Sequence, residues 1–131
     1  MKKFNWILFL SIIALIFSAC DDDDDDVPSN TDLISITWKV DEYSIIDGVE
    51  GEDRSSYTFT FNSDGTYTFN TPTAVTGTWQ FQSSSNESVI VLNGSENIDV
   101  LTLTETDLIL EFESPTFKNP DRIIHYELIP N

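Results

Sequence analysis

Few side chains in this 131-residue chain have the chemistry of an active site. His125 is the only histidine, and it alternates with the apolar residues Ile124 and Tyr126, which predicts an outward-facing position on a strand. The sequence around it has no signature of the partners that a Ser-His-Asp triad or a zinc site requires. We therefore expect His125 to be a solvated strand residue.

Carboxylates are abundant, and a suitably spaced pair can hydrolyse a glycoside. Glu111 and Glu113 flank Phe112, however, and Glu127 follows the same alternation, so solvated strand faces account for them. An acidic cluster between Asp47 and Asp53 could bind a cation such as Ca²⁺, but it lacks the ligand spacing of a calcium loop. The sequence predicts a protein that is not an enzyme, with no metal site and no cofactor.

The net charge of the chain is −17. All 23 acidic residues lie after position 20, against four basic residues there, so that part carries −19. Such a surface repels phosphate backbones, which excludes nucleic acid as a partner. Cys20 is the only cysteine, so the chain has no intramolecular disulfide.

The first nineteen residues are typical of an export signal. Lys2 and Lys3 are basic, and the apolar run Trp6–Phe17 is too short to span a bilayer of about 30 Å. Small residues then precede Cys20, and this arrangement resembles the bacterial lipoprotein signal, in which the cysteine is lipidated and becomes the first residue. The resemblance implies a signal peptide over residues 1–19 and a bilayer anchor through acylated Cys20. Two or more acyl chains hold a protein stably.

A run of six aspartates follows directly: Asp21, Asp22, Asp23, Asp24, Asp25 and Asp26. Mutual repulsion keeps such a run extended, so residues 20–32 are predicted to be a flexible acidic tether. Acidic residues behind a lipidated cysteine also resemble the export signal of surface lipoproteins in some Gram-negative bacteria. We expect an outer-membrane lipoprotein displayed on the cell surface, with the periplasmic leaflet as the alternative location.

Residues 33–131 are predicted to form one all-β domain, beginning with a short turn capped by Asp32. The stretch Tyr57–Phe81 alternates apolar and polar residues three times, with turn residues at Asn62–Gly65. Asn93-Gly94 is a second hairpin signal. Eight strands are predicted, starting near Trp38, Tyr57, Thr66, Val75, Ser88, Ile98, Leu108 and Arg122, with exposed loops over residues 47–54 and 114–121. Sequential antiparallel strands in this number favour a closed up-and-down barrel over an open sandwich.

Trp38, the run Tyr57–Phe61, the hairpin Asn62–Tyr67, the step Gly77–Trp79 and the later Leu101–Leu103 resemble small bacterial lipocalin-like domains. The resemblance implies an eight-stranded barrel with a cavity for a small hydrophobic ligand. Aromatic side chains that either line such a cavity or fill it are Trp38, Tyr57, Phe59, Phe61, Tyr67, Phe69, Trp79 and Phe81. Their number favours a largely filled interior.

The sequence therefore predicts a membrane-anchored lipoprotein whose non-catalytic domain binds a small hydrophobic ligand. The alternative is a cell-envelope protein with a filled barrel, which binds a protein or glycan through its outer face or its acidic Asp47–Arg54 loop. The sequence does not indicate the oligomeric state.

Overall fold

A computed structural model describes residues 27–116 and 119–131, and it consists of one short helix and ten strands. The elements are α1 (Asn30–Ile34), β1 (Thr37–Val40), β2 (Tyr43–Ile46), β3 (Val49–Asp53), β4 (Thr58–Phe61), β5 (Thr66–Thr71), β6 (Thr73–Ser83), β7 (Asn86–Leu92), β8 (Glu96–Leu103), β9 (Leu108–Thr116) and β10 (Asn119–Pro130). The signal segment, Cys20 and the six aspartates lie outside the described residues.

Eight of the strands form a closed antiparallel barrel. Strands β4 to β10 pair in sequence order, and β1 joins the two ends of this series. Trp38 on β1 lies opposite Phe59 of β4 on one side and Pro130 of β10 on the other. The prediction of an eight-stranded up-and-down barrel is confirmed, and the architecture is consistent with a lipocalin-like fold.

The predicted turns at Asn62–Gly65 and Asn93-Gly94 are also present. The amide of Asn62 donates to the Thr66 carbonyl at 2.8 Å, and Gly65 has φ +83°. Asn93 and Gly94 have φ values of 49° and 75°, the left-handed conformation that a tight hairpin turn needs. These turns are local, and their residues alone specify them.

The prediction of an exposed loop over Asp47–Arg54 is wrong. Strands β2 and β3 form a hairpin there, with Asp47 and Gly48 at its turn in positive φ. Strand β2 pairs with β10, where Ile45 lies opposite His125. Strand β10 therefore pairs with both β1 and β2 along one edge. The acidic residues that suggested a loop are tolerated in β3 because most of its residues are exposed.

Two further boundaries differ from the prediction. Strand β9 continues to Thr116 and β10 begins at Asn119, and these two residues pair across a shorter connection than the predicted loop over residues 114–121. Helix α1 begins at Asn30, inside the segment assigned to the tether. Its N-cap is Ser29, because Ser29 and Asp32 form a reciprocal capping box that satisfies two amides.

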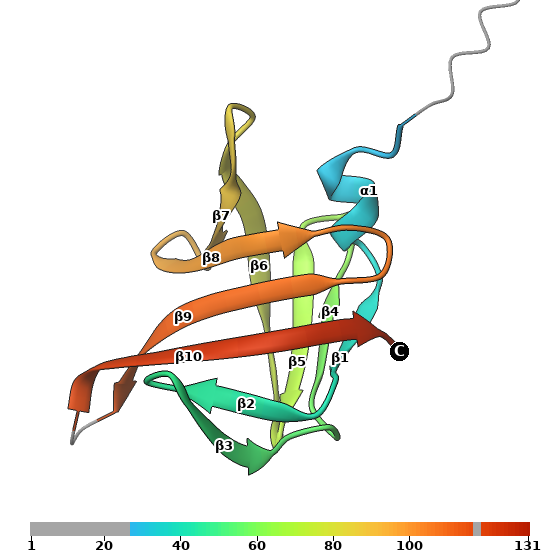
Figure 1. The fold of residues 1–131 in the computed structure, drawn as a ribbon. Helices are drawn as coiled ribbons and strands as arrows, with labels where there is room; N and C mark the ends of the chain where they lie inside the picture. Colours follow the sequence, from blue (N-terminus) through green and yellow to red (C-terminus); the bar gives the residue numbers. More distant parts are fainter. Residues whose placement is uncertain (1–26, 117–118) are drawn as a thin grey trace, which may run out of the picture.

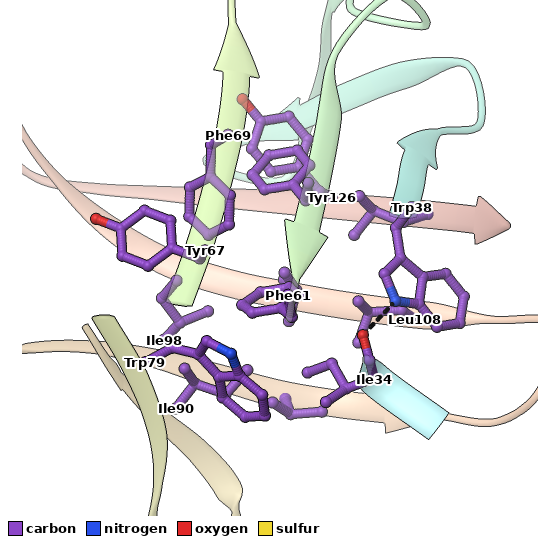
Figure 2. Packing of buried hydrophobic residues seen from close by; sticks show 14 of the residues in the cluster. Ile34, Trp38, Phe61, Tyr67, Phe69, Trp79, Ile90, Ile98, Leu108 and Tyr126 are labelled. Atoms are coloured by element: carbon purple, nitrogen blue, oxygen red, sulfur yellow. Dashed lines mark hydrogen bonds between the residues drawn. The ribbon is translucent and has the colours of Figure 1, made fainter. Parts of the chain in front are cut away.

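Helix α1 covers one end of the barrel, opposite the end where β3 lies (Figure 1), and Ile34 of α1 belongs to the hydrophobic core. Ile34 of α1 and Trp38 of β1 are fully buried, and the indole Nε1 of Trp38 donates to the Ile34 carbonyl at 3.1 Å. Figure 2 shows Phe61 between Trp79 and Phe69, with ring centroids 5.4 Å away from each. Helix α1 therefore covers this end of the barrel and adds the aliphatic Ile34 to the core.

Candidate ligand-binding site

A cavity of about 710 Å³ opens on the flank of the barrel. We call it the flank cavity, and its lining residues are Phe59, Tyr67, Phe69, Thr71, Val75, Leu92, Glu96, Asn97, Ile98, Asp99, Glu111, Phe112, Glu113 and Tyr126. Its aromatic surface comes from two hairpins that are far apart in the chain, β4 with β5 and β9 with β10. The predicted filled interior is therefore present only in part, beside a sizeable cavity.

Strand pairing explains where the flank cavity lies. Pairing between β6 and β7 starts at Trp79, so the first half of β6, residues 73–77, pairs only with β5. On the facing side, pairing between β8 and β9 ends at Glu111, and β9 continues beyond it with β10 alone. The strands thus diverge between these two edges, and the flank cavity lies at this gap in the pairing.

Two hydrogen bonds of the Asn93 side chain, which we call the Asn93 clamp, lie at one border of this opening, beside the lining residue Tyr67. Asn93, in the β7–β8 turn, donates from Nδ2 to the Tyr67 hydroxyl at 3.0 Å and accepts from the Thr78 amide at 3.1 Å. A side chain on Gly77 would not fit here, because its Cβ would lie 2.2 Å from Asn93 Oδ1 and 2.7 Å from Tyr67 Cε1. Glycine at this position therefore allows the turn to lock onto β5 and β6.

The rim of the flank cavity is acidic. Glu96 and Asp99 come from β8, and Glu111 and Glu113 from β9. Asp99 and Glu111 lie directly opposite each other in the ladder, so their charges repel. His125 on β10 lies 3.6 Å from Glu111 (Nδ1 to Oε2). The rim disfavours an anionic group and favours a neutral or cationic one.

Three of the eight predicted aromatic residues, Phe59, Tyr67 and Phe69, line the flank cavity. They are also buried and belong to the same core cluster as Trp38, Phe61 and Trp79. Tyr57 and Phe81 are partly buried against this cluster.

Sequence reasoning placed Phe112 and Tyr126 on inward faces but did not assign them to the cavity. Their alternation was the available signal, but it does not indicate where the wall opens. Glu111 and Glu113 are rim residues, although the alternation had assigned them simply to a solvated face.

The other titratable residues that the sequence analysis considered, His125 and Asp47, contact charged neighbours within the fold. His125 contacts two carboxylates, Glu111 and Glu127, each at 3.6 Å. Asp47 pairs with Arg122 and accepts from the Ile123 amide, so its carboxylate is used within the fold. No group of three or more His, Cys, Asp or Glu residues within the described ranges is arranged to hold a metal ion.

Comparison of the chain with models of protein families, with curated proteins and with solved structures finds no match. Among residues 27–116 and 119–131, no helix is long and apolar enough to cross a membrane.

Proposed function

We propose that the barrel is a non-catalytic binding module for a small hydrophobic or amphipathic ligand, and that acylated Cys20 anchors it to the outer membrane of a Gram-negative bacterium. The flank cavity is the observation that supports the binding function. Its volume of about 710 Å³ lies in the range typical of small-molecule sites, and it combines an aromatic wall with an acidic rim.

A neutral fluorescent probe, N-phenyl-1-naphthylamine, tests the binding function because its emission rises in an apolar site. Val75 on β6 lines the flank cavity and is 49% exposed, so Val75→Trp should narrow the opening without disturbing the core. Leu101, 53% exposed and away from the cavity lining, provides the matched control Leu101→Trp. We expect Val75→Trp alone to weaken probe binding. Equal binding by both variants, or no binding by the unmodified protein, would contradict the proposal.

The anchor and the sorting signal have a separate test, which rests on the sequence. Cys20→Ser removes the only sulfur that can carry a diacylglycerol, so the protein should become soluble or persist as an uncleaved precursor. Replacing Asp21–Asp26 with asparagine preserves the cysteine and removes the charge. If these carboxylates sort the protein, lipidation should persist while cleavage by external protease falls. If mass spectrometry finds that residue 20 is unmodified, the proposal of a lipid anchor is wrong.

The alternative function is binding of a protein or glycan partner in the cell envelope, and one observation favours a particular surface for it. Strand β3 ends the sheet, and Val49 at its start is 68% exposed. An open strand edge is a site where another chain can add. Capture of envelope components by the protein and by a Glu50→Gln, Glu52→Gln variant tests this. Identical recovery would remove the acidic side chains of the hairpin from consideration.

A further inference from the structure

A second cavity, of about 310 Å³, lies at the end of the barrel away from α1, and we call it the end cavity. Its lining residues are Ile46, Arg54, Tyr57, Thr71, Pro72, Arg122, Ile124 and Tyr126. Arg54 and Arg122 both line it, and they are two of the four basic residues that follow position 20, in a part of the chain whose net charge is −19. No carboxylate is among the lining residues. The end cavity is thus a cationic site in an otherwise acidic protein.

Arg54 is held rigidly in this cavity by aromatic residues. Its guanidinium lies over the rings of Tyr57 and Tyr126, at 5.5 and 5.7 Å from their centroids, and Nη1 donates to the Tyr126 hydroxyl. Stacking and this hydrogen bond fix the plane of the guanidinium. The donor side formed by Nε and Nη2 is the parallel pair that matches the two oxygens of a carboxylate.

The Nε atom of Arg54 is buried and has no hydrogen-bond partner among the described residues. Arg54 also forms no ion pair with any carboxylate whose side chain the structure describes. A buried donor on a permanently charged group is costly to leave unpaired. An oxoanion bound to Arg54 in the end cavity would offset this charge.

Tyr126 offers a second donor at the same place. Its hydroxyl oxygen accepts from Arg54, so its own proton is available for another acceptor. Burial raises the pKa of Tyr126, although the hydrogen bond and charge of Arg54 lower it, and the phenol stays protonated at neutral pH. Arg122 lies at the edge and is 40% exposed, and Asp47 at 3.5 Å offsets much of its charge, so Arg54 is the main cation of the cavity.

The two cavities are neighbours, because Thr71 and Tyr126 line both. Thr71 and Tyr126 form the wall between them, and a ligand that crosses this wall would place a polar head beside Arg54 and an apolar body against Phe69 and Phe112. The acidic rim of the flank cavity repels an anionic head from the other end, so the charges also fix the direction of the ligand.

We propose that the protein binds a monocarboxylate amphiphile, with the carboxylate on Arg54 and Tyr126 in the end cavity and the apolar body in the flank cavity. This inference rests on the proposed ligand-binding function and specifies the class of ligand. It selects a carboxylate over a neutral or cationic head on the same apolar chain.

The test compares three ligands with the same chain length by calorimetry on the purified full chain: dodecanoate, dodecanol and dodecyltrimethylammonium. Dodecanoate should bind at least about tenfold more tightly than dodecanol, since a hydrogen bond to a charged group contributes at least this factor. Arg54→Gln should abolish that preference and leave dodecanol binding unchanged. Lys39→Gln removes one positive charge from β1, outside both cavity linings, and should keep the preference.

Tyr126→Phe and Arg122→Gln provide evidence that does not depend on Arg54→Gln being folded, and each should reduce the preference in part. A preference that survives all three substitutions would overturn the proposal, as would equal or weaker binding of dodecanoate than of dodecanol. Binding of inorganic phosphate as tight as that of dodecanoate would also overturn it, because the site would then take a free oxoanion. If no twelve-carbon ligand binds, the proposed function fails; if dodecanol binds without any gain for dodecanoate, only the ligand class fails.

Discussion

Replacing Gly77 with alanine should destabilise the barrel and loosen the border of the flank cavity. The new Cβ would lie 2.2 Å from Asn93 Oδ1 and 2.7 Å from Tyr67 Cε1, both far inside contact distance. Asn93 must then move, and it would lose its bonds from the Thr78 amide and to the Tyr67 hydroxyl. The change therefore combines crowding with the loss of two hydrogen bonds.

The size of the effect follows from these parts. Crowding in a packed region costs about 1–3 kcal/mol, and each of the two hydrogen bonds contributes about 1 kcal/mol. The free energy of unfolding should fall by about 3–5 kcal/mol, which corresponds to a drop in Tm of at least roughly 12 °C for a domain of this size. Urea unfolding followed by circular dichroism measures both. Thr76→Ala, at the exposed neighbouring position, should change the free energy by less than about 0.5 kcal/mol.

A double-mutant cycle then isolates the clamp. Asn93 has φ 49°, so glycine fits its backbone, and Asn93→Gly removes both hydrogen bonds without strain. In that background Gly77→Ala should cost about 2 kcal/mol less than it does alone, because the two bonds are already absent. Additivity within about 0.5 kcal/mol would refute the clamp as the reason for glycine at this position.

Three other substitutions test separate parts of the fold. Ser44 is fully buried and its hydroxyl has no hydrogen-bond partner among the described residues, so Ser44→Ala should raise the free energy of unfolding by about 1 kcal/mol in urea. A loss of stability would mean that the hydroxyl is bonded. Trp38→Phe removes the bond to the Ile34 carbonyl and should cost at least about 1–3 kcal/mol, with a matching fall in Tm; an unchanged Tm would show that α1 does not depend on it. Asp64 accepts from the hydroxyl and amide of Thr66, and these bonds lower its pKa. That stabilisation is present above the carboxyl's ordinary pKa and is lost as pH falls through the lowered value, so Asp64→Asn should lower Tm at neutral pH and make less difference in strong acid. A Tm difference that grows on acidification would contradict this sign.

Much of the barrel follows from local patterns in the chain. Alternation along Tyr57–Phe81 and the later strands places apolar residues inward, because side chains of a strand point to opposite faces in turn. Asn62–Gly65 and Asn93-Gly94 specify their turns through residues that accept positive φ. Closure then follows from the number of sequential strands and the need to remove free edges.

The β2–β3 hairpin was missed although Asp47-Gly48 is itself a hairpin signal. The acidic residues around it suggested a loop, because charge is depleted in strands that have one buried face. Strand β2 is stabilised by its pairing with β10, at Ile45 and His125, which is a contact between distant parts of the chain. Local composition gives no information about such a partner.

The strand number of the barrel, the inward aromatic residues and the segment that resembles a lipoprotein signal can be predicted from the sequence, since each depends on neighbours along the chain. The position of the flank cavity in the wall and the charges that line it depend on contacts between distant strands. The flank cavity forms because β6 pairs with β7 only from Trp79 onward and β9 pairs with β8 only as far as Glu111. Arg54 meets Tyr126 across 72 positions of sequence. Strand register brings these groups together, and register is a property of the whole closed sheet, so no window of the sequence contains it.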